Sequence, residues 1–256
     1  MRSLLNRCRG FSRTGRRERV SFPSNDFEAI YAVGDVHGCF QQLQDSVRSI
    51  IEDARNVNGK KLIVFLGDYV DRGPDSRSVI EYLLQLQLED FKHIFLCGNH
   101  DDKCLRFLRE PSRNMDWLNF GGETTLQSYG LDIRHVLRRG GNARDLERFL
   151  ADAIPPTHLE FLTRLPVVLE VGRLVFVHAG IRPGIQIDKQ RDHDLLSIRE
   201  PFISQGPKID TIVVHGHTSG VVPTTGPNRI GIDTAVFATG RLAVLRLGRG
   251  GHTFLS

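Results

Sequence analysis

The sequence predicts an α/β fold built from two mixed sheets that pack face to face, with helices outside. Two observations support this prediction. Before residue 103, apolar runs typical of buried strands alternate with segments whose apolar residues recur at helical spacing. After residue 165, short strands follow one another with hairpin-like turns between them. At 256 residues, with 40% hydrophobic and 25% charged residues, the chain can bury a sizeable core.

The first part of the chain reads as repeated strand, loop and helix. The predicted strands are short, rich in β-branched and aromatic residues, and closed by Gly, as buried strands are. We expect strands at 27–33, 62–66 and 93–97 and helices at 40–56 and 76–88. Residues 103–165 are mostly helical in pattern and carry fewer candidate ligands, so we expect a helical cap insertion there.

The second part of the chain has β character. Residues 167–170 and 173–177 flank Val171-Gly172, which predicts a hairpin, and residues 209–214 form another apolar strand. Two further runs are expected to pair with each other around a turn at Thr239-Gly240. These runs are residues 229–233 and 242–247.

The amino terminus differs in charge from the rest of the chain. Its first 19 residues hold seven arginines and one acid, a charge of +6, so the other 237 residues carry −2 of the overall +4. We therefore expect residues 1–26 to form a basic, disordered extension and residues 27–256 to form one folded domain. Because the basic charge lies in this tail, no nucleic-acid-binding face is expected.

Two further absences in the sequence bear on location. No apolar run approaches the ~18 to 20 residues that a membrane span needs, so no membrane association is expected. The four cysteines form no CxxC pair, which favours a reduced, cytoplasmic compartment over a disulfide scaffold.

Polar side chains follow five of the predicted strands, at the point where each strand ends. Two aspartates, one asparagine and three histidines stand there: Asp35, His37, Asp68, Asn99, His178 and His217. Such a mixed set of oxygen and nitrogen donors suits Mn²⁺, Fe or Zn²⁺ better than Ca²⁺. Six donors exceed what one tetrahedral ion needs, so two ions that share a carboxylate are expected, with Asp68 as the bridge. His215 is an alternative to His217.

Five segments in a fixed order carry a family resemblance. GDVHG (34–38), GDYVDRG (67–73), GNHD (98–101), VHAG (177–180) and GHT (216–218) resemble the signature of the phosphoprotein phosphatase family of calcineurin-like metallophosphoesterases, in particular its bacterial and phage-type members. The segments WLNFGGETTLQSYG, FVHAGIRPG, LLSIRE and NRIGIDT extend the resemblance over about residues 29–247. It implies a four-layer α/β/β/α metallophosphoesterase sandwich.

The resemblance also implies a role for each matched residue. One metal ion would be held by Asp35, His37 and Asp68, and the other by Asp68, Asn99, His178 and His217. His100 would be the general acid oriented by Asp71, and Arg72 and Arg199 would bind the phosphate. The implied cofactors are two divalent ions, with Mn²⁺ expected and Fe or Zn²⁺ as alternatives. The implied reaction is in-line attack on phosphorus by a metal-bridging hydroxide, without a phosphoenzyme.

The expected function is that of a metal-dependent phosphoprotein phosphatase acting on phosphorylated Ser or Thr, with Tyr left open. Its expected partner is therefore a phosphorylated protein or peptide. The alternative is a nucleotide hydrolase of the bis(5'-nucleosyl)-tetraphosphatase type. The intact Val70-Asp71-Arg72-Gly73 and His37 favour the phosphatase, since symmetrical nucleotide hydrolases tend to vary there. A noncatalytic scaffold is a third possibility. Two positions depart from the family pattern, Ser219 in place of Pro and Ala235 in place of Gly.

Overall fold

The computed structural model describes residues 16–134, 143–248 and 250–255, with the side chains of residues 143 and 144 excepted. Its first half contains β1 (Arg19–Phe22), β2 (Ala29–Val33), α1 (Phe40–Ala54), β3 (Lys61–Phe65), α2 (Ser76–Gln85), β4 (Phe91–Phe95), α3 (Asn99–Arg109), the 3-10 helices η2 (Pro111–Arg113) and η3 (Met115–Phe120), and α4 (Gly122–Ser128). Its second half contains α6 (Ala143–Ala153), α7 (Pro156–Arg164), β5 (Val168–Val171), β6 (Leu174–Val177), η4 (Ile187–Lys189), α8 (Asp192–Ser197), α9 (Phe202–Gln205), β7 (Ile212–His215), β8 (Thr224–Gly226), β9 (Arg229–Gly231), α10 (Val236–Thr239), β10 (Val244–Gly248) and β11 (Gly251–Leu255).

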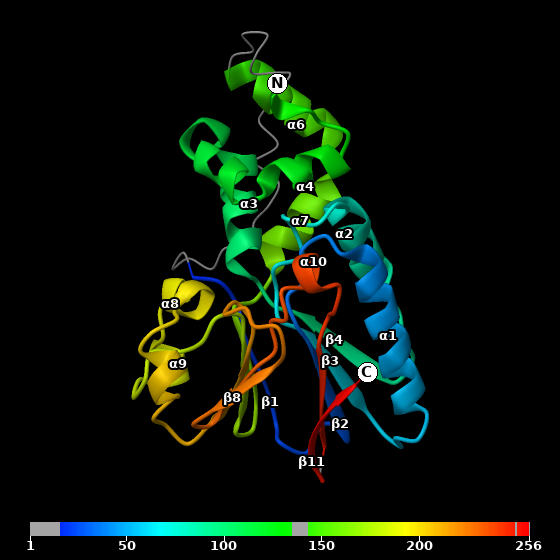
Figure 1. Cartoon of the computed structure of the whole chain (residues 1–256), viewed down its shortest axis with the longest axis vertical. Coiled ribbons are helices and arrows are strands. Elements are labelled where there is room, and N and C mark those ends of the chain that lie inside the picture. The colour runs from blue at the N-terminus through cyan, green and yellow to red at the C-terminus, as the bar shows by residue number, and fades with distance from the viewer. Residues whose placement is uncertain (1–15, 135–142, 249, 256) are drawn as a thin grey trace.

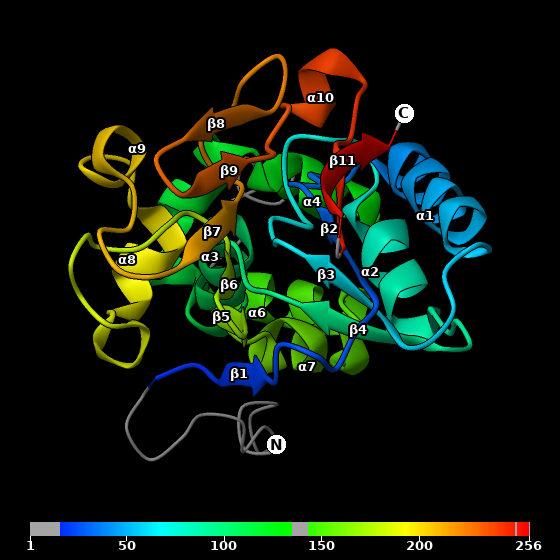
Figure 2. The same cartoon turned by 90° about the horizontal axis from the view of Figure 1, so that it is seen from below.

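The described strands form two mixed sheets. One has the order β11-β10-β2-β3-β4, in which β2, β3 and β4 run parallel and β10 runs antiparallel to its neighbours. The other has the order β1-β5-β6-β7-β9-β8, in which β6, β7 and β9 run parallel. Figure 1 and Figure 2 show the two sheets side by side at the centre of the molecule.

The core between the sheets follows from the two-residue period of the strands. Ile30 and Ala32 of β2 and Leu62 and Val64 of β3 belong to the same buried apolar cluster as Phe176 of β6 and residues of β5, β7 and β9. The intervening residues of these strands point the other way and pack against helices. Alternate apolar residues from both sheets therefore fill one inner layer.

Helices cover the outer face of each sheet. The apolar stripe Leu43, Val47 and Ile50 of α1 is buried, as is that of α2, and both helices lie against the β2-β3-β4 sheet (Figure 2). Helices α8 and α9 lie on the far side of the other sheet (Figure 1). The predicted four-layer α/β/β/α fold is confirmed.

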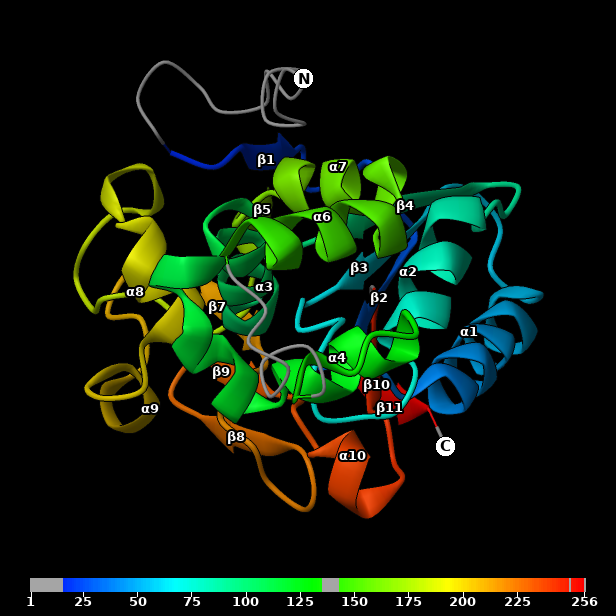
Figure 3. The same cartoon turned by 90° about the horizontal axis from the view of Figure 1, so that it is seen from above.

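The strand register brings the functional loops together. Val33 pairs with Phe65, and Phe65 with Phe95, so β2, β3 and β4 end at the same level. In the other sheet Val177 pairs with His215, so β6 and β7 also end together. The loops that follow these parallel strands share one edge of the sandwich, beneath α3, α4, α6 and α7 (Figure 1, Figure 3).

The predicted boundary at residue 26 is wrong for the segment that the structure describes. Residues 19–22 form β1, which pairs in parallel with β5 from Arg19↔Val168 to Phe22↔Val171. Arg17 is buried and donates to the carboxylate of Asp102 and to the carbonyl oxygens of Leu162 and Leu165. The edge of β5 offers backbone partners that the sequence does not reveal. Residues 1–15 of the expected extension lie outside the described residues.

The predicted pairing of residues 229–233 with 242–247 is also wrong. β9 pairs with β7 and β8, whereas β10 pairs with β2 and β11 in the other sheet. The residues between them form α10, and Gly240 ends this helix with φ of 69° rather than turning a hairpin. Both runs are apolar because both face the layer between the sheets, a property that does not fix which sheet each joins.

The expected helical insertion contains α4, α6, α7 and most of α3 within the described residues. These helices lie together above the edge of the sandwich (Figure 1). Residues 135–142 of the insertion lie outside the described residues. No helix among the described residues is long and apolar enough to cross a membrane.

Candidate active site

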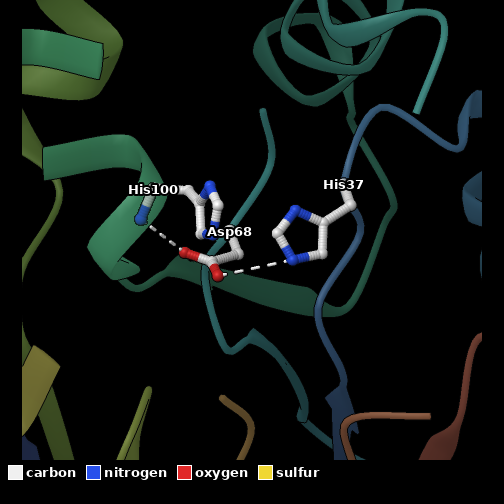
Figure 4. Close-up of side chains that lie close together, drawn as sticks. All are labelled: His37, Asp68 and His100. Carbon is white, nitrogen blue, oxygen red and sulfur yellow. Dashed lines mark hydrogen bonds and ion pairs between the residues drawn. The ribbon is translucent and has the colours of Figure 1, made fainter. Parts of the chain in front are cut away.

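Asp68 lies where two groups of possible ligand atoms meet. It forms one group with His37 and His100 and another with Asp35 and His178, and within each group the ligand atoms lie within 4.8 Å of one another. The distance from Asp68 Oδ2 is 3.5 Å to His37 Nε2 and 3.4 Å to His178 Nε2. Figure 4 shows His37 and His100 on either side of this carboxylate. The geometry therefore allows Asp68 to serve two cation positions at once.

Backbone carbonyls orient the two histidines that face Asp68. His37 Nδ1 lies 2.9 Å from the Val70 carbonyl oxygen, and His178 Nδ1 lies 3.0 Å from that of Leu66. Each Nδ1 thus carries the proton that the carbonyl accepts, which leaves an unprotonated Nε2 toward the carboxylate. The same arrangement is usual for histidines that bind metals.

Asn99 adds a further acceptor to this cluster. Its Oδ1 lies 2.8 Å from His178 Nε2, the nitrogen that is left without a proton. Three electron-pair donors therefore converge here, and none of them carries a hydrogen that could bridge to another. They are Asp68 Oδ2, Asn99 Oδ1 and His178 Nε2. A divalent cation satisfies such a set, so these residues fit a metal ion.

Asp35, which follows β2, and His217, which follows β7 of the other sheet, complete the set. The backbone N–H of His217 donates to both carboxylate oxygens of Asp35, at 3.3 and 3.1 Å. The His217 and His178 rings lie 5.1 Å apart, and the buried Nε2 of His217 has no hydrogen-bond partner among the described residues. His215 instead packs against Phe202, with its ring centroid at 5.1 Å. The geometry thus places His217 beside the other candidate ligands.

Burial keeps the candidate histidines in the neutral form that binds metals. It lowers the pKa of His37 to about 4 and that of His217 to about 3, and it also lowers the pKa of His178. Burial would raise the pKa of Asp68, but the neighbouring histidines His178, His100 and His37 hold it below its usual range. An ionised carboxylate among neutral imidazoles is the state in which all these groups can donate electron pairs.

His100 and Asp71 form a second unit beside this cluster. His100 Nδ1 donates to Asp71 Oδ2 at 2.7 Å. Asp71 is fully buried and also accepts from Trp117 Nε1 and from Thr125 Oγ1, both at 2.8 Å. Burial would lower the pKa of His100, but the carboxylates of Asp68 and Asp71 outweigh this effect and raise it. The arrangement fixes the ring of His100 and favours its protonated form.

The two arginines lie at different depths. Arg72 Nη2 is 3.1 Å from His100 Nε2, so its guanidinium borders the site directly. Arg199 is exposed and reaches the site only at its edge, with Nη2 3.5 Å from the carbonyl oxygen of His217. The structure thus groups Arg72 with His100 and leaves Arg199 on the rim.

The backbone of the site is held in conformations that most residues avoid. His37, Asp68, Asp71, Arg72 and His217 all have positive φ, between 44° and 72°. A Cβ on Gly98 would overlap Asp68 Oδ1, and one on Gly216 would overlap Asp35 Oδ1. Glycine is required at both positions because a carboxylate oxygen lies in direct contact with the backbone there and leaves no room for a Cβ.

Sequence reasoning missed Trp117 and Thr125, two of the side chains that hold the site in place. Trp117 and Thr125 bind Asp71, and the buried Asp101 accepts from the backbone N–H groups of Asp68, Tyr69 and Gly98 at 2.8 to 2.9 Å. Both Trp117 and Thr125 lie in the segment WLNFGGETTLQSYG, which carries part of the family resemblance and holds the one tryptophan of the chain. This segment could have pointed to them.

Comparison with known proteins identifies the family. The model of the calcineurin-like phosphoesterases matches residues 29–236. The chain belongs to this family of metal-dependent phosphoesterases, and the fold and the ligand groups around Asp68 agree with it. The family implies a dinuclear site for divalent metals.

Two curated relatives share a more particular name. The chain is 27% identical over 237 residues to the bis(5'-nucleosyl)-tetraphosphatase PrpE [asymmetrical] of Oceanobacillus iheyensis, covering 85% of this chain and 88% of the relative. It is 29% identical to the protein of the same name from Anoxybacillus flavithermus, covering 84% and 88%.

Solved structures show the same fold. A structure described as a "putative diadenosine tetraphosphatase" matches with a TM-score of 0.64 at 23% identity, covering 93% of this chain and 97% of that one. A cold-active protein-tyrosine phosphatase of a Shewanella species matches with a TM-score of 0.56 at 13% identity, covering 94% and 83%.

These findings correct the predicted function. The phosphoprotein phosphatase expected from the motifs, and its phosphorylated protein partner, are contradicted by relatives that are named as hydrolases of dinucleoside tetraphosphates. The residues used to favour the phosphatase, Asp71, Arg72 and His37, lie beside the candidate ligands around Asp68. Both substrate classes carry phosphate groups, so these residues do not discriminate between them.

Proposed function

We propose that this chain is a metal-dependent hydrolase of dinucleoside tetraphosphates that cleaves them asymmetrically, into a nucleoside triphosphate and a nucleoside monophosphate. The observation that supports it most directly is the convergence of unprotonated donors on Asp68, next to the Arg72–His100–Asp71 unit. The curated relatives, matched over most of their length, supply the substrate class.

The ligand assignment is part of this proposal. Following the family resemblance, Asp35, His37 and Asp68 would hold one ion, and Asp68, Asn99, His178 and His217 would hold the other. The structure brings all six side chains to one edge, where Asp35 also lies within reach of His178. The mixed oxygen and nitrogen donors suit Mn²⁺, Fe or Zn²⁺, and of these we propose Mn²⁺. When bound, the two ions lower the pKa of a water molecule and neutralise charge on the reacting phosphate.

Side chains of the protein bind the phosphate and supply the proton in the proposed mechanism. Arg72 holds a nonbridging phosphate oxygen through its guanidinium, and Arg199 approaches from the rim. His100 donates a proton to the departing phosphate oxygen, while Asp71 keeps the ring oriented and stabilises its charged form. Trp117 and Thr125 hold Asp71 in turn, so the acid is positioned before the substrate arrives.

The helices above the site fit a cap over a long substrate. Helix α3 carries Asn99 and His100 at its first turn and packs against α7, which links the insertion to the site. We propose that the described residues form one catalytic domain in which this insertion, at about 103–165, borders the substrate.

Hydrolysis of diadenosine tetraphosphate by metal-stripped protein, before and after addition of Mn²⁺, tests the proposal. We expect turnover only with the metal, and no turnover of the Asp68→Asn variant, which lacks the shared carboxylate. Asp45→Asn is the matched control, because Asp45 is an exposed carboxylate on α1. Metal-restored cleavage of a phosphopeptide, without cleavage of the dinucleotide, would overturn the proposal.

A further inference from the structure

An exposed phenylalanine lies over the phosphate-binding arginine. The ring centroid of Phe237 is 4.8 Å from the guanidinium carbon of Arg72 and 5.5 Å from the ring centroid of His37. Nevertheless, 42% of Phe237 remains exposed. Phe237 therefore offers open ring surface directly beside the candidate site.

Phe237 is part of a larger apolar rim beside the site, which we define as Val221, Val222 and Phe237. Val221 is 67% exposed and Val222 is 58% exposed. The loop that carries the two valines follows His217 directly, so it starts at a candidate metal ligand. The rim is thus contributed by the loop that follows His217 and by α10.

The rim is held rigidly by Asp233. Its Oδ1 accepts from the backbone N–H of Ala235 at 2.8 Å, and its Oδ2 accepts from Ser219 Oγ at 2.6 Å. Its backbone oxygen accepts from Gly220 N–H at 3.0 Å. Asp233 therefore fixes both the start of α10, which carries Phe237, and the loop of the two valines. A platform fixed in advance loses little conformational entropy when a ligand binds.

A second contact links the loop of the two valines to the segment that follows α10. Arg241 Nη2 donates to the carbonyl oxygen of Val221 at 3.1 Å, and Arg241 follows α10 in the chain. Thr234 Oγ1 donates to the Arg241 carbonyl oxygen at 2.6 Å, which ties the two ends of the α10 segment together. The exposed ring of Phe237 is thus carried by a segment that hydrogen bonds hold at both ends.

We propose that Phe237 is the stacking platform for a purine base of the substrate. This inference rests on the proposed function, because a dinucleoside tetraphosphate carries a base at each end of its phosphate chain. One side of the ring faces Arg72, which binds phosphate in our proposal, and the exposed part remains for the base of the adjoining nucleoside. Stacking on an aromatic side chain is a common way to hold a base without reading its edges.

The competing explanation is that Phe237 only shields Arg72 and His37 from water. The two explanations can be separated by comparing a substrate that carries bases with one that has none, provided that both contain a phosphoanhydride bond. We would compare kcat/KM for diadenosine tetraphosphate with kcat/KM for inorganic tripolyphosphate, in wild type and in Phe237→Ala, Phe237→Leu and Phe237→Trp. Phe149→Ala is the matched control, because Phe149 is 37% exposed and lies under the guanidinium of Arg148 at 5.4 Å, but on α6.

The proposal predicts a change in substrate preference. In Phe237→Ala the ratio of kcat/KM for the dinucleotide to that for tripolyphosphate should fall about tenfold, mainly through a higher KM for the dinucleotide. Phe237→Leu should behave like the alanine variant, Phe237→Trp should restore the ratio, and Phe149→Ala should keep it. If Phe237→Ala does not fold, the comparison of leucine with tryptophan decides the question.

Two outcomes would overturn the inference, and they are distinguishable. An equal loss on both substrates, or no loss on either, would show that Phe237 holds Arg72 or does nothing, while the proposed function stands. Wild-type cleavage of tripolyphosphate without cleavage of the dinucleotide would overturn the proposed function, and the base platform with it.

Discussion

His100 Nδ1 donates to Asp71 Oδ2 at 2.7 Å, and Asp71 is enclosed by Trp117 and Thr125. This hydrogen bond leaves His100 one orientation, in which Nε2 lies 3.1 Å from Arg72 Nη2 at the edge of the candidate metal site. An acid held in this way can protonate a leaving oxygen without first having to be oriented. In the proposed mechanism the pair therefore sets the side of the site on which the leaving group would be protonated.

Replacement of His100 by Asn should slow turnover without releasing metal. We expect kcat on diadenosine tetraphosphate to fall by roughly 10-fold to 100-fold. This loss is small for the removal of a general acid, because a phosphate leaving group is a weak base and needs little help from a proton. An alkyl phosphate ester, whose leaving group is a strong base, should suffer a larger loss. Steady-state kinetics and metal analysis measure both effects. His93→Asn, a change in β4, is the control, and unchanged turnover in His100→Asn would remove His100 from the mechanism.

Replacement of Arg17 by Met should destabilise the fold. Arg17 is buried, pairs with Asp102 at 2.9 Å and donates to two backbone carbonyls, so its loss leaves several acceptors without a partner. We expect a loss of about 2 to 4 kcal/mol in the free energy of unfolding, measured by urea denaturation. Arg55→Met, at an exposed position after α1, should change it by less than ~0.5 kcal/mol. Equal stability of the two variants would mean that the segment before β1 does not contribute to the folded domain.

Replacement of Ala235 by Gly should stabilise the protein. Ala235 has φ of 50° and ψ of 53°, a left-handed conformation in which its Cβ is strained. We expect a gain of about 0.5 to 1 kcal/mol in the free energy of unfolding. Ala238→Gly, inside α10, should have the opposite sign, because glycine weakens a regular helix. A loss of stability in both variants would show that Ala235 is not strained.

Acidification should destabilise the protein through His158. This side chain is buried between Tyr129 and Glu81, and burial lowers its pKa, although Glu81 opposes the effect. The unfolded chain therefore binds a proton more readily than the folded one, so the free energy of unfolding decreases as the pH falls below the ordinary histidine range. The difference in stability between pH 7 and pH 5 should be smaller in His158→Gln than in wild type. Both proteins share all other titrating groups, so an unchanged difference would contradict the assignment.

Much of the fold could be predicted from the sequence because local patterns determined it. Apolar runs of strand length ended in Gly-Asp or Gly-Asn, and the parallel register then forced the loops after β2, β3 and β4 to one edge. The candidate ligands Asp35, Asp68 and His178 could be found in the same way. Which strand pairs with which could not, because β9 and β10 are both apolar on one face and join different sheets.

The substrate could not be predicted from the same motifs. In the proposed mechanism Asp68, His100 and Arg72 act on phosphorus and metal, which do not differ between the two substrate classes. The features that differ between substrates lie outside the motifs, at positions such as Phe237, whose exposure is visible only in the fold. Strand β1 likewise could not be predicted from the Arg-rich composition of its segment, because its pairing with β5 depends on backbone groups and not on side chains.

The most direct test of the proposed function is the identity of the products of diadenosine tetraphosphate, separated by anion-exchange chromatography after incubation with the Mn²⁺-loaded protein. We predict equal amounts of ATP and AMP. Formation of ADP alone would show symmetrical cleavage, and absence of any product at every metal concentration would contradict the proposal that this site hydrolyses dinucleoside tetraphosphates.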